Sequence, residues 1–418
     1  MMRRCAGLLF CLVAGSTVLA GGWPNWRGPG LNGVASGSGY PTHWSKAENV
    51  AWTFDLPGKG ASTPVVWGDR IVLTCAIKGQ NGVFCLGRDG KPLWQKTIGS
   101  GKPGKHAKAT GCNPSAVTDG ERWYVYFKSG DLACLDSYGN TLWQQNLQKL
   151  YGADTLWWDL GTSPVLTKDF VVVAVMHSGP SPSYLAAFDK LTGKEAWKCD
   201  RNLDAPSEAA QSYSTPVVVN DGGPEILVVL GADHVTAHSA ADGSELWRVG
   251  GLNPDADGFF RSIASPVVEG GIVVAPYARG RTLTAIRLGG RGDVTKTHVL
   301  WTKTDLGADV PTPAALDGKI YLCSDRGGLS CLDALTGKVL WEGLAEKNRN
   351  AFSASPVIAD GKIYITREDG KIFVLELGKE FKLLGANSLD GEFVVATPVF
   401  VDGRILIRSA ERLYCIGR

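Results

Sequence analysis

Residues 188–197 read Phe188-Asp-Lys-Leu-Thr-Gly-Lys-Glu-Ala-Trp197, and residues 332–341 repeat the pattern as Leu332-Asp-Ala-Leu-Thr-Gly-Lys-Val-Leu-Trp341. The aspartate of this pattern can bond the backbone of a turn, and the glycine takes the left-handed conformation that the turn needs. The tryptophan then begins a strand. Glycine stands four residues before tryptophan in five repeats, at Gly90/Trp94, Gly139/Trp143, Gly193/Trp197, Gly243/Trp247 and Gly337/Trp341. Self-similarity of this kind indicates a repeat architecture.

A second repeated signal is a proline at the start of a short apolar run. Successive prolines are 50, 50, 52, 50, 47, 43 and 42 residues apart, an interval that suits one four-stranded propeller blade. Proline fits the opening of an innermost strand, where its missing N–H costs no ladder bond. The eight pairs are Thr63-Pro64, Asn113-Pro114, Ser163-Pro164, Thr215-Pro216, Ser265-Pro266, Thr312-Pro313, Ser355-Pro356 and Thr397-Pro398.

The turns between these strands complete the prediction of the fold. Asp-Gly pairs such as Asp317-Gly318 and Asp360-Gly361 supply the positive φ angles of two-residue hairpins. The sequence therefore predicts an all-β, eight-bladed β-propeller of four-stranded antiparallel blades. The last repeat stops after its third strand at residues 413–416, whereas residues 49–55 form an outer strand without a blade. We expect this N-terminal strand to close the last blade, which removes exposed edges.

The broad tryptophan rings are predicted to face the next blade and to bury apolar area between blades. Repeats five and seven depart from the pattern, since Trp301 follows a glycine-rich insertion at residues 289–294 and the motif is lost near Phe381. The predicted docking residues are Trp94, Trp143, Trp197, Trp247, Trp301 and Trp341.

The chain divides into three predicted segments. Residues 1–20 carry Arg3 and Arg4, an apolar run and a small-residue end, which is the pattern of a secretory signal peptide. Residues 21–43 form an N-terminal extension, and residues 44–418 form the propeller. No later stretch approaches the roughly 20 apolar residues that span a bilayer. The prediction is an exported bacterial protein, periplasmic or extracellular, without a transmembrane segment in the mature chain.

The charge balance bears on the class of partner. The chain has 43 Lys+Arg against 41 Asp+Glu, and removal of Arg3 and Arg4 leaves 41 of each. A neutral mature chain without a basic stripe argues against nucleic acid and acidic membranes as partners. The densest basic stretch, residues 102–108, is interpreted as a solvated loop.

Eight cysteines remain after removal of the signal peptide, and export permits disulfides. Cys75 and Cys85, like Cys323 and Cys331, lie on strands that we expect to pair, so each couple can form a bridge. The alternative is that cysteine serves as a small buried hydrophobe at one repeated strand position. The members of that position are Cys85, Cys134, Cys331 and Cys415.

The repeated Asp-x-x-Thr-Gly-Lys-x-x-Trp pattern resembles the tryptophan-docking motif of the pyrroloquinoline-quinone-like (PQQ-like) propeller family. That family includes quinoprotein alcohol and glucose dehydrogenases and the propeller lipoprotein of the outer-membrane β-barrel assembly machinery. Residues 23–29, Trp-Pro-Asn-Trp-Arg-Gly-Pro, are similar to the opening of other exported bacterial propellers, and we expect them to pack across the ring. The resemblance implies the fold and not an activity, because the motif is structural.

A candidate ligand site is predicted where the loops from each outer strand reach the next inner strand, around one mouth of the channel. Alignment of these loops on the prolines brings five polar residues together, and aromatic residues can form the walls. The alternative is that the mouth is polar because water fills it. The polar residues are Asp159, Gln211, Arg261, Asp309 and Asn350, and the aromatic residues are Trp157, Trp158, Phe259 and Phe260.

The resemblance to quinoprotein dehydrogenases supplies no catalytic residue. Their quinone lies between a tryptophan and two adjacent bonded cysteines, with calcium beside it, and this sequence has no adjacent cysteine pair. PQQ and calcium are thus possible cofactors that no specific residue supports. Asn253, Asp255 and Asp257 match the first positions of a calcium loop, but position twelve is Ala264, and a polar turn is the alternative interpretation.

Three hypotheses about function follow. The first is a noncatalytic binding or protein-interaction scaffold in the cell envelope, whose partner is an envelope protein or a small molecule. The second is a divergent PQQ-dependent quinoprotein oxidoreductase. The third is a carbohydrate-binding or sensor propeller, suggested by Trp157 and Trp158.

Overall fold

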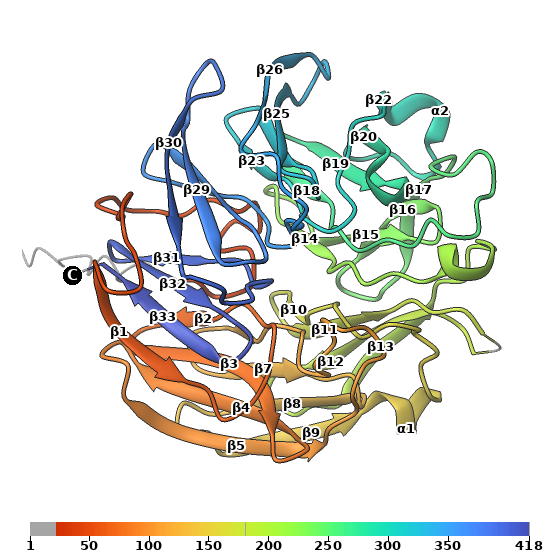
Figure 1. Ribbon diagram of the computed structural model, residues 1–418. Helices are drawn as coiled ribbons and strands as arrows, with labels where there is room; N and C mark the ends of the chain where they lie inside the picture. The colour runs from red at the N-terminus through yellow and green to blue at the C-terminus, as the bar shows by residue number, and fades with distance from the viewer. Residues whose placement is uncertain (1–21, 180, 418) are drawn as a thin grey trace, which may run out of the picture.

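The structure is a computed structural model that describes residues 22–179 and 181–417, so the predicted signal peptide at residues 1–20 lies outside the described residues. Its strands form eight sheets arranged in a ring around a central channel (Figure 1). The eight-bladed all-β propeller is therefore confirmed. We number the blades along the chain from the sheet that begins at residue 65.

The first four blades contain the following strands. Blade 1 has β2 (Val65–Trp67), β3 (Arg70–Ile77), β4 (Gln80–Gly87) and β5 (Pro92–Ser100); blade 2 has β6 (Val117–Thr118), β7 (Trp123–Tyr126), β8 (Asp131–Leu135) and β9 (Thr141–Asn146). Blade 3 has β10 (Val165–Leu166), β11 (Phe170–Val175), β12 (Tyr184–Asp189) and β13 (Glu195–Asp200); blade 4 has β14 (Val217–Val219), β15 (Ile226–Gly231), β16 (His234–Ser239), β17 (Glu245–Val249) and the short β21 (Gly292–Asp293).

The other four blades follow the same order from the channel outward. Blade 5 has β18 (Val267–Glu269), β19 (Ile272–Tyr277), β20 (Thr282–Arg287) and β22 (Val299–Thr304); blade 6 has β23 (Ala314–Leu316), β24 (Lys319–Cys323), β25 (Gly328–Asp333) and β26 (Val339–Leu344). Blade 7 has β27 (Val357–Ala359), β28 (Lys362–Thr366), β29 (Lys371–Glu376) and β30 (Leu383–Ser388); blade 8 has β31 (Val399–Val401), β32 (Arg404–Arg408), β33 (Arg412–Ile416) and β1 (Val50–Asp55). The helices α1 (Leu147–Tyr151) and α2 (Thr295–His298) are single turns.

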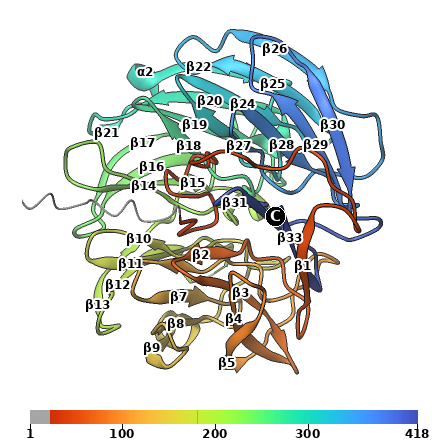
Figure 2. The same ribbon diagram turned by 90° about the vertical axis from the view of Figure 1, so that its left-hand side faces the viewer.

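The ring closes between the two ends of the described chain. Strand β1 pairs antiparallel with β33, with Phe54 opposite Leu413, and so becomes the outer strand of blade 8. Both views show the two strands side by side near the C-terminus (Figure 2). Because one blade is made from both ends of the sequence, opening the ring requires breaking a complete strand ladder.

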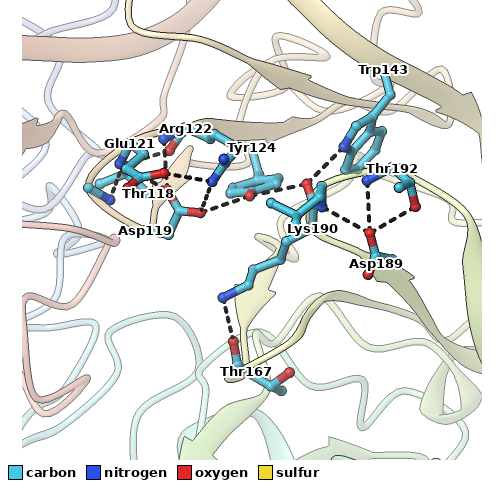
Figure 3. Close-up of polar contacts among 12 residues, drawn as sticks. Thr118, Asp119, Glu121, Arg122, Tyr124, Trp143, Thr167, Asp189, Lys190 and Thr192 are labelled. Carbon is cyan, nitrogen blue, oxygen red and sulfur yellow. Dashed lines mark hydrogen bonds and ion pairs between the residues drawn. The ribbon is translucent and has the colours of Figure 1, made fainter.

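Five of the six predicted docking tryptophans, and Trp52 of β1, donate their indole N–H to the following blade. The Trp143 indole Nε1–H donates to the Lys190 carbonyl of blade 3 at 2.9 Å, and Asp189 accepts bonds from the Thr192 backbone N–H and hydroxyl in the same turn (Figure 3). A Cβ atom on Gly193 would lie 2.4 Å from the Trp143 ring, so any larger residue would prevent the indole from packing there. The φ of 68° at Gly193 also favours glycine. The equivalent bonds are Trp94 to Ser137 (3.0 Å), Trp197 to Ala240 (3.1 Å), Trp301 to Ala334 (3.0 Å), Trp341 to Gly378 (3.1 Å) and, from β1, Trp52 to Arg88 (3.0 Å).

Blade 4 differs from the four-stranded pattern. The glycine-rich insertion of repeat five returns to the neighbouring blade, where Gly292 and Asp293 form β21 and pair in parallel with Trp247 and Arg248. Trp247 is 1% exposed beneath this insertion. The insertion therefore covers the outer edge of blade 4 with a fifth strand, which the sequence did not indicate.

The proline alignment is wrong in one repeat. Strand β6 begins at Val117, three residues after Pro114, whereas the other seven prolines stand directly before their innermost strands. Ala116 occupies the equivalent position in blade 2. The spacing to Pro114 is nearly regular, so the two-residue shift was invisible in the sequence.

The proposed disulfide couples lie on paired strands but out of register. Cys75 is opposite Gly82 and Cys85 is opposite Val72, an offset of three residues, and an offset of two separates Cys331 from Leu329, the partner of Cys323. All eight cysteines among the described residues are free, so the bridging hypothesis is wrong. The alternative is confirmed, because each cysteine of the repeated position is buried opposite a large outer-strand tryptophan: Cys85 opposite Trp94, Cys134 opposite Trp143, Cys331 opposite Trp341 and Cys415 opposite Trp52.

The N-terminal extension lies inside the ring against the innermost strands. It exchanges backbone bonds with Val66, Thr118 and Ile358, and the Asn32 amide reaches the Ala315 carbonyl. These four partners occupy the same level of blades 1, 2, 7 and 6. The buried Arg27 guanidinium lies nearer the loops and donates to the carbonyls of Pro313 (2.7 Å) and Pro356 (3.0 Å). The segment thus crosses the ring, and removal of Arg27 would leave buried carbonyls without donors.

Within the part of the chain that the structure describes, no helix is long and apolar enough to cross a membrane. The predicted boundaries of the extension and the propeller remain predictions.

Replacement of Trp143 by alanine tests the docking contact. We expect a loss of about 3–5 kcal/mol in unfolding free energy, because the change opens a cavity between two blades. Trp143→Phe should cost less, since it keeps much of the buried area and loses the bond to Lys190. Urea unfolding followed by circular dichroism measures both. Tyr138→Ala, on a side chain that is 74% exposed, is the control, and an equal effect of the Trp143 and Tyr138 variants would contradict the docking role.

His238 on β16 provides a pH-dependent test of the core. Burial lowers the pKa of His238 to about 4, and its neutral ring contacts the Gly243 carbonyl (3.0 Å) and the Thr236 hydroxyl (2.9 Å). The pKa of a histidine in the unfolded chain is about 6.5, so the contribution of neutral His238 to the free energy of unfolding is complete above pH 6.5. This contribution decreases as the pH falls towards 4, by up to about 3 kcal/mol.

The thermal midpoint of the wild type should therefore fall between pH 7 and pH 5, and it should fall less in His238→Gln. The exposed His106→Gln serves as the control. Identical pH dependence in the wild type and His238→Gln would show that this histidine does not titrate as described.

Candidate channel-mouth site

A ring of hydroxyl side chains surrounds the channel where the innermost strands begin. Seven of the eight backbone N–H groups, from Thr63 round to Ser355, donate to the hydroxyl of the next blade. The hydroxyls thus fix the relative height of neighbouring blades. The bonds are Thr63 to Ser115 (2.9 Å), Ser115 to Ser163 (2.9 Å), Ser163 to Thr215 (3.0 Å), Thr215 to Ser265 (2.8 Å), Ser265 to Thr312 (2.8 Å), Thr312 to Ser355 (3.0 Å) and Ser355 to Thr397 (3.2 Å).

A cavity of about 830 Å³ lies at this mouth of the channel. All eight hydroxyl residues line it, and Trp26 lines it from the N-terminal extension. Its other walls come from loops that follow outer strands and from hairpins between second and third strands. Such a volume lies within the roughly 300–1,000 Å³ typical of small-molecule pockets.

The structure brings together most of the residues that the loop alignment selected. Asp159, Arg261, Asp309, Trp157 and Trp158 line the cavity, as does Phe259. Three others do not line it: Gln211, Asn350 and Phe260.

Gln211 and Asn350 hold loops in place. The fully buried Gln211 accepts bonds from the Trp157 backbone N–H (3.1 Å) and the Tyr213 hydroxyl (2.8 Å), and it donates to Ser178 (2.9 Å). The Asn350 amide donates to Asp369 at 2.9 Å. These side chains form hydrogen bonds with neighbouring loop residues and do not line the cavity.

A chain of charged groups crosses one wall of the cavity. The Arg261 guanidinium forms two bonds of 3.0 Å with the Asp309 carboxylate, and its Nε lies 3.4 Å from the Glu208 carboxylate. The same Glu208 oxygen accepts the Trp158 indole N–H at 2.8 Å. The arginine charge is therefore shared by two carboxylates. Loop alignment missed Glu208, because it lies in a single turn of 3₁₀ helix three residues before the aligned position.

Two further carboxylates of the cavity are held by backbone N–H groups. Asp159 accepts bonds from Thr110 (3.0 Å), Gly111 (3.3 Å) and Leu160 (2.8 Å), yet burial raises the pKa of its carboxyl above the usual range. Asp325 accepts the N–H groups of Asp309 (2.7 Å) and Val310 (3.1 Å), and burial raises its pKa as well. Asp325 lies on the hairpin after β24, outside the loops that the alignment compared.

The basic loop at residues 102–108 is not merely solvated. Lys108 forms an ion pair with Glu368 of blade 7, and Ser353 also contacts this carboxylate. The His106 ring stands edge-on to Trp158 at a centroid distance of 6.0 Å. His106 and Lys108 both line the cavity; the interpretation of a solvated excursion is wrong for the ion-paired Lys108, whereas His106 is exposed. The loop reaches across the mouth, which its sequence did not reveal.

The proposed calcium loop is a hydrogen-bonded turn. Both the amide oxygen and the amide nitrogen of Asn253 bond to the Asp257 backbone, at 2.9 and 3.0 Å, and the nitrogen also donates to Asp233. Asp255 is exposed. Among residues 22–179 and 181–417, no group of three or more His, Cys, Asp or Glu side chains is placed to hold a metal ion. Calcium binding by Asn253, Asp255 and Asp257 remains a prediction.

The cavity does not fit a quinone cofactor of the dehydrogenase type. PQQ is a planar tricarboxylate, so its site must offer several buried cations or a metal, whereas Arg261 and Lys108 already have carboxylate partners and Arg279 is exposed at the rim. The remaining acidic groups, Asp159 and Asp325, would repel it. We therefore assign no chemical step to such a cofactor.

The fold and the cavity define a closed eight-bladed propeller with a small-molecule-sized cavity at one mouth of its channel. The profile of the family PQQ_2, described as outer membrane protein assembly factor BamB, matches residues 33–198, 182–293 and 292–392. These matches cover most of the chain, and the protein belongs to this family.

One curated protein and two solved structures are similar to the chain. The outer membrane protein assembly factor BamB of Yersinia pestis is 24% identical over 249 residues, and the match covers 56% of each protein, so the chain spans about half the length of this curated relative. The crystal structure of BamB from Moraxella catarrhalis superposes with a TM-score of 0.63 at 16% identity, covering 88% of this chain and 99% of that one. A europium-containing methanol dehydrogenase superposes with a TM-score of 0.71 at 12% identity, covering 95% and 98%. Both structures support the fold alone.

Arg261 is expected to be needed for stability of the mouth. Arg261→Met leaves Glu208 and Asp309 without their shared counter-charge, and breaking such a buried pair costs about 3–5 kcal/mol. Urea unfolding should show this loss. Arg279→Met, at an exposed arginine of the same cavity, is the matched control and should change stability by less than about 0.5 kcal/mol. A similar stability for the two variants would contradict the proposed network.

Proposed function

We propose that this protein is an exported, noncatalytic interaction scaffold of the cell envelope, which binds a partner protein at the channel-mouth face. The family description and the Yersinia pestis relative both refer to an outer membrane protein assembly factor, which supports a partner from outer-membrane protein assembly. Export rests on the predicted signal peptide at residues 1–20.

The observation that carries the proposal is that most of the charged side chains at the mouth already have partners within the protein. Arg261 and Lys108 have carboxylate partners, and Asp159 and Asp325 accept backbone N–H groups. A general base or a nucleophile needs a reactive group that is free to meet a substrate. A rigid mouth with internally satisfied charges is better suited to recognition, since little reorganisation accompanies binding.

The rim adds a surface suited to protein contact. Trp157, Trp158 and Phe259 are 38%, 41% and 62% exposed, and Phe393 on the loop before β31 is 39% exposed. Aromatic residues are enriched at the energetic centres of protein interfaces. The exposed leucines lie mainly on outer strands and adjacent turns, for example Leu142 and Leu191, away from this cluster.

Site-specific photo-crosslinking tests the proposal. A photoreactive phenylalanine analogue at Phe259 or Phe393 should form crosslinks with a component of the outer-membrane assembly machinery in intact cells, identified by mass spectrometry. The same analogue at Leu191, 59% exposed in the turn before β13, is the matched control and should not. Crosslinks to that machinery from Leu191 alone, or from no position, would reject the mouth as its binding face.

A further inference from the structure

We propose that the mouth cavity binds a neutral, polyhydroxylated ligand, a short oligosaccharide. This inference goes beyond the proposed function, because the ligand would lie inside the cavity, whereas the partner protein is assigned to the rim.

The hydroxyl ring supplies hydrogen-bond donors. Each serine or threonine hydroxyl has one O–H group and two lone pairs, and seven of the eight oxygens already accept a backbone N–H. Within residues 22–179 and 181–417, none of the eight O–H groups donates to a protein acceptor. All eight side chains line the cavity, and the residues are at least nine-tenths buried. The floor therefore presents donors that need acceptor oxygens from water or a ligand.

The charges of the cavity favour a neutral ligand over an ionic one. Arg261 is bonded to two carboxylates, and Lys108 is paired with Glu368. An anion would have to displace those carboxylates, and a cation would have to displace arginine or lysine. Arg279 is exposed at the rim, where solvent screens its charge. A neutral ligand needs no such exchange, and it can still donate its own hydroxyl groups to the lone pairs of Glu208 and Asp325.

Aromatic side chains provide the apolar part of the site. Trp26 at the floor and Trp157, Trp158, Tyr213 and Phe259 in the walls all line the cavity. A pyranose ring has an apolar C–H face and a rim of hydroxyls, which matches a site that has aromatic faces and many hydrogen-bonding groups. The Trp158 ring is fixed by its bond to Glu208 and by the His106 ring, so little entropy is lost when it stacks.

The oligosaccharide proposal is tested with the full mature protein on an array of neutral and acidic glycans, followed by calorimetric titration with the neutral glycan that binds best. We expect binding of at least one neutral glycan. Trp157→Ala should weaken it at least tenfold, because the cavity wall loses an aromatic face. Thr215→Val, which removes one ring hydroxyl at nearly constant volume, should weaken it severalfold.

Tyr138→Ala, on an exposed aromatic residue of the turn before β9, is the control and should bind as the wild type does. Circular dichroism verifies that each variant is folded, and the Trp157 variant decides the result if Thr215→Val unfolds. The absence of any neutral glycan ligand, binding of acidic glycans only, or unchanged affinity in Trp157→Ala would overturn the proposal. None of these outcomes affects the crosslinking test of the rim.

Discussion

The structure depends on one repeated contact, in which a tryptophan of an outer strand packs on a glycine of the next blade and donates its indole N–H to a backbone carbonyl there. A four-stranded blade has two apolar faces and cannot bury them alone. The docking residue covers one face of each neighbour, as Trp143 does on Gly193 and Lys190. The small residue opposite it, cysteine or alanine, leaves room for the indole within its own sheet.

Ring closure turns these pairwise contacts into a rigid frame. Strand β1 supplies both the missing outer strand of blade 8 and Trp52, which docks on blade 1. At the channel, the hydroxyl ring sets the height of each blade, and the N-terminal extension holds blades 1, 2, 6 and 7 from within through groups such as Arg27. The mouth loops are thus attached to rigid blades. Their side chains can pair across blades with little further loss of conformational entropy.

The candidate site was predicted in part. Asp159, Arg261 and Asp309 were found because loops of equal topology meet around one axis, so a shared offset from the proline places them together. Gln211 shares this offset but faces the protein wall, because an offset does not specify a side-chain direction. Asp325 was not predicted, since hairpins between second and third strands reach the same mouth from a different part of each repeat.

The sequence by itself determined the class of fold, the number of blades and the closing strand, because these follow from local turn chemistry and from a repeat period of 42 to 52 residues. Only the tertiary structure decided the strand register that separates Cys75 from Cys85, the fifth strand on blade 4, and the ion pair between Lys108 and Glu368. The physical reason is the separation along the chain of the residues that form each feature. A turn is encoded by residues that are neighbours in the chain, whereas Lys108 and Glu368 meet only after the ring has brought blades 2 and 7 to the same mouth.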